Sequence, residues 1–347
     1  MTLWITLLLG CEVAEKSTDT GVATTEDSDT PSDTDTSPPW VPTGSGVAYY
    51  LDGVEPNSLF TLEMGTVTPP PESDSYAAYL MGSSSAELYI GPVPVTETTL
   101  FWQSETGINA LTGGYNRIEI RLVTAGDVIY SGQVDPIVET TYQKLLISSP
   151  DTPDGDGSLR EIQQTLETLI QHNSDIIAIE GDMPAIHQGA EATVNTILGT
   201  GIDYNNDTII SQIPDLLPLI GDSLADTDEL SNLRNLVLAD LDAASLAAHQ
   251  ISPTHHIKDL ANYAYDCTQL IGTYVQQAAN TADNVAGGIT DEADCDARLQ
   301  ESNAFLQFAL DGFDVNEDGQ IEDLTEGTIN CAIYHVSQMA YMEVGLH

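Results

Sequence analysis

The chain has 347 residues, with 54 acidic residues against 8 basic ones and a formal net charge of −46 at pH 7. Such a charge repels nucleic-acid phosphates and anionic lipid head groups, so the composition argues against nucleic acid as a partner and favours divalent cations. The same charge also fits a protein that stays soluble in a salty medium, where ions screen its self-repulsion.

The first eleven residues contain an apolar run that ends in Leu8-Leu9-Gly10-Cys11. The run is too short to cross a bilayer and has the length of a short signal-peptide core. Its last four residues resemble the lipobox of bacterial lipoproteins, although no Lys or Arg precedes the run. We predict a lipoprotein signal peptide over residues 1–11 with Cys11 as the lipidated residue. The alternative is an unprocessed apolar N-terminus.

Residues 12–45 are rich in Ser, Thr, Asp and Pro and contain little that could be buried. Segments of this composition do not form a packed core, and their like charges extend them. We therefore predict a disordered acidic tether. No later stretch is apolar over the roughly 18 residues that a transmembrane helix requires. Attachment to a membrane is thus expected through a lipid anchor only.

From residue 46 to residue 148 the apolar residues alternate with polar ones or form short runs, separated by Gly, Pro, Ser and Asn. This pattern is typical of short strands with one buried face. The last of these runs contains Leu145 and Ile147. About eight such strands predict an antiparallel β-sandwich over residues 46–148. A barrel of similar strand count is the alternative that the pattern leaves open.

After residue 149 the spacing of apolar residues changes to three and four, as in Leu159, Ile162, Leu166 and Leu169. That spacing indicates amphipathic helices. Further helical patterns cover 183–200, 228–250, 255–286, 291–311 and 326–344. We predict an antiparallel α-helical bundle over residues 149–347 and, for the whole chain, an α+β fold with two domains.

Three cysteines remain if Cys11 carries lipid, namely Cys267, Cys295 and Cys331. In antiparallel helices that rise about 1.5 Å per residue, Cys267 and Cys331 fall at similar heights, whereas Cys295 lies near the opposite end. We therefore predict a Cys267–Cys331 disulfide. Cys295 is left either free or paired with another chain.

Two acidic segments, residues 203–215 and 314–326, share the pattern G-[IF]-D-x-N-x-D-x-x-I followed by a final acid. Oxygen ligands at positions 1, 3 and 5, a backbone carbonyl at position 7 and an apolar anchor at position 8 describe an EF-hand-type calcium loop. The predicted ligands are Asp203, Asn205, Asp207, the Ile209 carbonyl and Asp215 in the first loop, and Asp314, Asn316, Asp318, the Gln320 carbonyl and Glu326 in the second.

Both loops depart from the EF-hand pattern, because the acid expected at position 12 comes one residue later. In addition, Thr208 stands where Gly allows the sharp turn, whereas Gly319 keeps it. The shared displacement favours a shortened, dockerin-like loop with a structural calcium ion over a regulatory EF-hand pair. The alternative for each segment is an Asx-rich turn that caps a helix.

Two histidine pairs have the spacing of one helical turn, His187 with Glu191 and His335 with Met339. Imidazole combined with a carboxylate or a thioether suits iron, copper or zinc. Histidines packed in a core are the commoner case. No metalloprotease, serine-hydrolase, P-loop or dinucleotide motif is present in the sequence, which argues against an enzyme.

The chain resembles bacterial envelope proteins that join the extracytoplasmic β-sandwich of anti-sigma-K factors to a helical region with Asp/Asn-rich loops. The resemblance lies in residues 76–93, 114–123, 128–134, 149–159, 186–199, 283–288 and 314–340. Anti-sigma activity requires a cytoplasmic domain joined through a membrane span, and this sequence contains neither. The resemblance therefore implies a fold and an envelope location but no activity.

Together these features predict a non-catalytic, calcium-stabilised lipoprotein that binds an unidentified ligand at the cell surface or in the periplasm. The alternative is a periplasmic iron- or copper-handling helical protein that uses His187 with Glu191 or His335 with Met339.

Overall fold

The alternating residues of the first third of the chain form strands in a computed structural model, which describes residues 40–50, 59–82, 86–95, 98–107, 110, 113–221, 232–251, 257–314 and 327–347. The predicted signal peptide and most of the predicted tether lie outside these residues. The first seven strands are β1 (Ser45–Tyr50), β2 (Leu59–Gly65), β3 (Tyr76–Gly82), β4 (Glu87–Val93), β5 (Leu100–Glu105), β6 (Tyr115–Leu122) and β7 (Val128–Val134).

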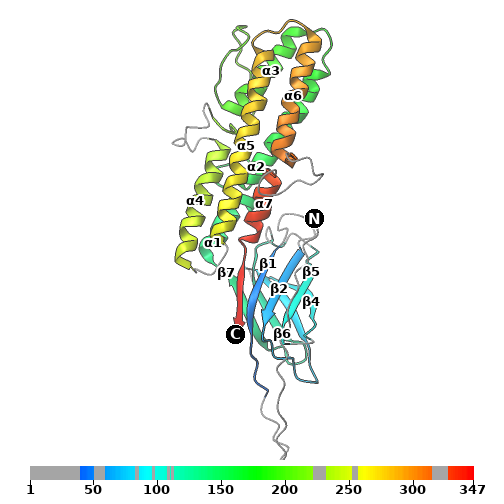
Figure 1. The fold of residues 1–347 in the computed structure, drawn as a ribbon, viewed down its shortest axis with the longest axis vertical. Coiled ribbons are helices and arrows are strands. Elements are labelled where there is room, and N and C mark those ends of the chain that lie inside the picture. The colour runs from blue at the N-terminus through cyan, green and yellow to red at the C-terminus, as the bar shows by residue number, and fades with distance from the viewer. Residues whose placement is uncertain are drawn as a thin grey trace, which may run out of the picture. The chain divides into compact units, whose positions relative to one another are not determined.

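All strands of the described residues belong to one antiparallel sheet of eight strands in the order β4-β3-β6-β7-β8-β1-β2-β5. The sheet curls so far that its two end strands approach each other, and the Ser104 hydroxyl of β5 donates a hydrogen bond to the Ile90 carbonyl of β4 at 3.3 Å. The sheet is thus nearly barrel-shaped, as Figure 1 shows. The predicted two-sheet sandwich is wrong and the barrel alternative is closer, because alternation reveals a buried face but not how a sheet curls.

Aromatic residues fill the concave side of the sheet. Tyr50 packs edge-on against Phe60 with ring centroids 5.3 Å apart, and Tyr76 packs in the same way against Tyr130 at 5.8 Å. Each tyrosine hydroxyl also donates to a backbone carbonyl, so that burial of these rings leaves no polar group unsatisfied. The inward face therefore forms a solid core.

The eighth strand, β8 (Met342–Leu346), comes from the end of the described chain. It pairs antiparallel with β7, with Met342 opposite Val134, and with β1, with Val344 opposite Gly46. The helix predicted over 326–344 instead ends at Gln338. Five residues are too few for periodicity to separate a strand from a helical turn, so the prediction was wrong here. β8 joins β4-β3-β6-β7 to β1-β2-β5.

The described part of the chain contains seven α-helices, all between β7 and β8. They are α1 (Pro136–Tyr142), α2 (Ser158–Ile177), α3 (Met183–Leu198), α4 (Leu233–Ile251), α5 (Ile257–Ala286), α6 (Glu292–Asp311) and α7 (Ile329–Gln338), with a π-helical turn, η1 (Gln143–Ile147), after α1. Leu145 and Ile147, predicted to lie in a strand, belong to this turn. Asp135 caps α1 and Pro136 opens it, which starts a helix where the alternation suggested a strand.

α5 is the longest of these helices and packs against α3, α4, α6 and α7 (Figure 1). Its buried face includes Cys267, Ile271, Val275 and Ala278 at helical spacing. The helical segment leaves the sheet at Val134 and returns at Met342, two residues that face each other across the β7–β8 ladder. The helices thus occupy the place of a hairpin loop. Among the described residues, no helix has both the length and the apolar character needed to span a membrane.

Candidate functional site

The first acidic loop begins where α3 ends, after Gly199 in a left-handed conformation with φ 69°. Three backbone N–H groups of the loop donate hydrogen bonds to the buried carboxylate of Glu191 on α3. Tyr204 N and Asn205 N bond to Oε2 at 2.9 and 3.4 Å, and Ser211 N bonds to Oε1 at 2.8 Å. A buried carboxylate is tolerated when such donors surround it. Glu191 therefore holds both ends of the turn against the helix.

Asn195 lies one turn further along α3 and is buried as well. Its Nδ2 donates to the carbonyls of Ile202 at 2.8 Å and Ser211 at 3.0 Å. Its Oδ1 accepts from the Thr200 hydroxyl at 2.6 Å and from Ile202 N at 2.9 Å. All four hydrogen bonds that an asparagine side chain can make are thus directed at this loop.

Within the loop, the predicted calcium ligands fold around their own backbone. Asp203 accepts from Asp207 N at 3.1 Å and from Thr208 N at 2.9 Å, and Asn205 Oδ1 accepts from the same Asp207 N at 2.9 Å. Asp207 in turn accepts from Ile209 N at 2.7 Å. The oxygens of positions 1 and 3 therefore converge on one amide of the turn, which is the hydrogen bonding of an Asx-rich turn.

Thr208 has a φ of 76°, the left-handed conformation for which an EF-hand uses Gly. This conformation is unfavourable for a residue with a branched Cβ, by about 1–2 kcal/mol. The hydrogen bond from its N–H to Asp203 offsets part of that cost. The turn is therefore left-handed at the position where an EF-hand has glycine, although the sequence lacks the glycine.

One feature of the loop differs from the sequence prediction. Ile210, expected as the buried apolar anchor, is 58% exposed, and Ile209 beside it is 53% exposed. Asp215, the last predicted ligand, is exposed and has a left-handed φ of 65°. The buried anchor of this segment is instead Glu191 on α3, and the sequence contained no signal for it other than its spacing from His187.

The second acidic loop is described only at its start. Gly312 ends α6 with a φ of 90°. Phe313 then packs on Phe308 with ring centroids 4.3 Å apart, and Asp314 follows it. The remaining predicted ligands, Asn316, Asp318, Gln320 and Glu326, lie outside the described residues.

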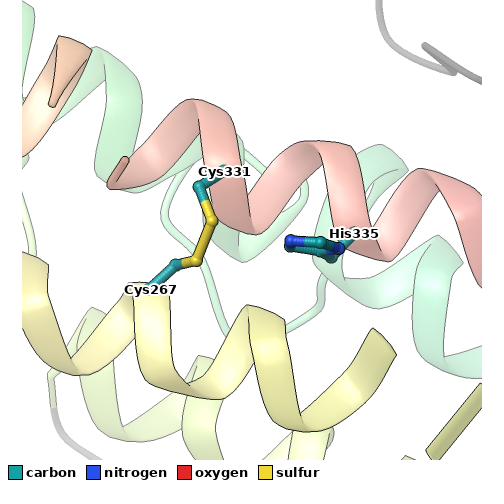
Figure 2. Close-up of side chains that lie close together, drawn as sticks. All are labelled: Cys267, Cys331 and His335. Carbon is teal, nitrogen blue, oxygen red and sulfur yellow. A yellow bond between two sulfur atoms is a disulfide. The ribbon is translucent and has the colours of Figure 1, made fainter. Parts of the chain in front are cut away.

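Cys267 of α5 and Cys331 of α7 form a disulfide, the pairing predicted from their heights on the helices. Both are buried, and His335 follows Cys331 by one turn on the same side of α7. Figure 2 shows the imidazole ring beside the two sulfur atoms. One ligand atom from each of the three residues lies within 4.8 Å of those of the other two.

His187 and Glu191 have separate partners in the structure. His187 Nε2 lies 2.7 Å from the Ile289 carbonyl, whereas Glu191 is directed at the acidic loop. For the other pair, His335 lies against the disulfide, and Met339 ends α7 with its N–H bonded to the His335 carbonyl at 3.2 Å. Cys295 is a free, buried thiol on α6. Burial raises its pKa, and the negative charges of nearby carboxylates raise it further.

The convex face of the sheet carries a group of residues that the sequence analysis missed. Val47 of β1 lies between Glu63 of β2 and Glu343 of β8 in the strand register. Next to this row, the rings of Tyr49 and Tyr341 are nearly parallel, 11° apart in plane and 6.4 Å between centroids. The missed strand β8 supplies Glu343, and Tyr341 directly precedes this strand, so sequence alone could not bring these side chains together.

Tyr49 and Glu63 interact directly, because the Tyr49 hydroxyl donates to Glu63 Oε1 at 2.6 Å. Burial and this hydrogen bond raise the pKa of Tyr49 to about 12. Burial also raises the pKa of Tyr341, and the negative charges of Glu343 and Glu63 raise it further. A hollow on this face is lined by Val47, Tyr341, Glu343 and the small residues Ser45, Gly46 and Gly345. We call this surface the tyrosine–glutamate face.

Comparison of the chain with protein-family models, with curated proteins and with solved structures gave no match. The resemblance to the anti-sigma-K β-sandwich therefore remains a prediction from the sequence.

Proposed function

We propose that this chain is a non-catalytic binding protein of the bacterial cell envelope, lipid-anchored at Cys11 and stabilised by calcium. In this proposal residues 12–45 form the tether, and the sheet and a helical bundle act as two modules. The protein faces the periplasm or the cell surface. Its ligand is not a nucleic acid, because the net charge of −46 repels phosphates.

The observation that carries the calcium part is the turn at residues 203–209. Asp203, Asn205 and Asp207 bond around one stretch of backbone, and Thr208 keeps the left-handed turn of a calcium loop without its glycine. Glu191 and Asn195 fix the same turn on α3. A loop held in this shape loses little conformational freedom when a cation binds, which favours binding. Calcium would then connect the loop more firmly to the helices.

Thermal unfolding tests this part. We expect calcium, and neither magnesium nor zinc, to raise the Tm of the EDTA-treated chain, since a hundredfold excess over Kd adds about 2.7 kcal/mol. Asp203→Ala with Asp207→Ala should remove the contribution of the first loop, and Asp314→Ala with Asp318→Ala that of the second. Asp242→Ala, at an exposed site of α4, is the control. A calcium response that survives both double variants, or no response at all, would refute the calcium proposal.

The tyrosine–glutamate face is the binding surface that we propose. The stacked rings of Tyr49 and Tyr341 offer an apolar contact area, and the two glutamates, two strands apart, offer hydrogen-bond acceptors about 9–10 Å from each other at the backbone. The described residues that line the hollow include no Lys or Arg, which disfavours anionic ligands. Aromatic contact area and acceptors together suit a neutral oligosaccharide, whose C–H groups contact rings while its hydroxyls donate.

Binding to an array of neutral oligosaccharides, followed by calorimetric titration of any hit, tests this surface. We expect Tyr341→Ala and Glu343→Gln each to weaken binding by about tenfold or more, as loss of a central aromatic or polar contact does. Tyr89→Ala is the matched control, because Tyr89 is an exposed ring on β4. Equal binding by Tyr341→Ala and the wild type would exclude this face as the site.

The alternative function, iron or copper handling through His187 and Glu191, has less support. Glu191 already accepts three backbone hydrogen bonds, and His187 is engaged with the Ile289 carbonyl. A metal at this pair would have to break the contacts that hold the acidic loop on α3.

A further inference from the structure

We propose that Cys267, Cys331 and His335 form a redox-controlled site for a thiophilic transition-metal ion such as zinc. The site is closed while the disulfide is intact and becomes available when the disulfide is reduced. It is independent of the calcium loops and of the tyrosine–glutamate face.

The placement of the three residues supports this inference. Cys331 and His335 are four residues apart on α7 and share one side of the helix, and α5 brings Cys267 to the same point from across the interface. Their ligand atoms lie within 4.8 Å of one another. All three residues are at least nine-tenths buried, at 0, 2 and 7% exposure. Two thiolates and one imidazole are the donor set of zinc sites that keep a fourth position open.

The distances required by a metal ion are within reach of small side-chain movements. Zinc binds sulfur at about 2.3 Å and nitrogen at about 2.0–2.1 Å, so tetrahedral ligand atoms lie roughly 3.3–3.8 Å apart. Breaking a disulfide lets its sulfurs separate from about 2 Å to that distance through changes in χ1. The Cα atoms of Cys267 and Cys331, 6.1 Å apart, need not move far.

The imidazole is held in place from two sides. The ring of Tyr263 on α5 and the ring of Tyr334 on α7 each lie 5.3 Å from the His335 ring, centroid to centroid. This packing limits rotation of the imidazole, so that one ligand is positioned before the metal arrives. The net charge of −46 also attracts cations to the chain.

The redox step is a two-electron reduction. A dithiol reductant gives two electrons and two protons to the Cys267–Cys331 bond, which becomes two thiols, while the reductant closes to its own disulfide. Metal binding then displaces the thiol protons, leaving two thiolates and the neutral His335 imidazole as ligands, with water at the fourth position. In the reverse step a disulfide oxidant accepts two electrons from the two thiolates and two protons from solvent and becomes a dithiol, while the metal leaves and the Cys267–Cys331 bond forms again.

The experiment uses the full chain with Cys11→Ser and Cys295→Ser, which leaves Cys267 and Cys331 as its two cysteines. The protein is reduced with dithiothreitol, freed of reductant without oxygen, assayed for thiols under denaturing conditions and titrated with cobalt(II), a coloured substitute for zinc. We expect thiolate-to-cobalt charge-transfer absorption at one ion per chain, and none before reduction. His335→Ala should weaken cobalt binding by about tenfold or more.

His172→Ala is the matched control, since His172 on α2 bonds to the Gly189 carbonyl away from the cysteines, and it should leave the titration unchanged. Reduced, folded protein with two measured thiols and no cobalt band would overturn the proposal, as would a band of full affinity in His335→Ala. If reduction alone unfolds the helices, zinc should restore their circular dichroism, and failure to do so would equally overturn it.

Discussion

Removing the Glu191 carboxylate tests whether the first acidic loop is held from α3. In Glu191→Ala, three N–H groups of Tyr204, Asn205 and Ser211 lose their acceptor. A hydrogen bond to a charged acceptor contributes about 1.5–3 kcal/mol, but the loop is partly exposed and water replaces some of the loss. We therefore expect the free energy of unfolding to fall by about 2–4 kcal/mol.

Urea unfolding followed by circular dichroism measures this change, and limited proteolysis locates it, since the released segment between residues 200 and 213 should be cleaved first. The free energy of unfolding of Glu191→Gln should lie between those of the wild type and Glu191→Ala, because the glutamine amide keeps one acceptor oxygen and replaces the other by a donor. Glu167→Ala, at an exposed position of α2, is the control and should stay within about 0.5 kcal/mol of the wild type. A Glu191→Ala protein as stable as this control would refute the reasoning.

Three further predictions concern the sheet and the disulfide. Val344→Asp places a charge in the core at the centre of β8 and should cost more than about 4 kcal/mol in urea unfolding. The pKa of Tyr49 is raised to about 12 in the folded protein from 10.0, so the contribution of Tyr49 to the free energy of unfolding is complete below pH 10 and is lost as the pH rises toward 12. The difference in stability between the wild type and Tyr49→Phe, followed over this pH range, measures the loss. Replacing Cys267 and Cys331 by Ala opens a link over 64 residues and should cost about 4 kcal/mol.

Two of these predictions have a control within the same chain. Leu346→Asp changes an exposed residue of the same strand as Val344 and should cost less than about 1 kcal/mol. Cys295→Ser changes the free thiol and should keep the disulfide. If Val344→Asp and Leu346→Asp are equally stable, β8 does not lie between β7 and β1. A stability difference between the wild type and Tyr49→Phe that does not change with pH would contradict the tyrosine prediction. A double cysteine variant as stable as the wild type would contradict the disulfide prediction.

The helices were predictable because long amphipathic periods repeat many times. The patterns over 255–286 and 291–311 match α5 (Ile257–Ala286) and α6 (Glu292–Asp311) within two residues. The same geometry brought Cys267 and Cys331 to one height. β8 was not predictable, because its five residues include only two buried apolar positions, and the order of strands depends on contacts between residues far apart in sequence.

The acidic loop was predictable in part. Asp203, Asn205 and Asp207 follow a local sequence pattern. In the structure their side chains accept hydrogen bonds from backbone amides a few residues away, and such contacts depend on nearby sequence alone. The role of Glu191 depends instead on which face of α3 the loop covers, a tertiary contact. Its spacing from His187 suggested a metal pair, whereas its actual partners are the amides of residues 204, 205 and 211.

The two metal sites that we propose can be separated in one sample because their donors differ. The acidic loop offers carboxylate, amide and carbonyl oxygens, which calcium prefers, whereas the cysteine cluster offers two sulfurs and one nitrogen, which zinc and cobalt prefer. Calcium should therefore raise the Tm of the oxidised protein and produce no absorption change. Cobalt should change the absorption only after reduction. A cobalt band that calcium abolishes, or a calcium response that appears only after reduction, would mean that the ions share one site and that the donor assignment is wrong.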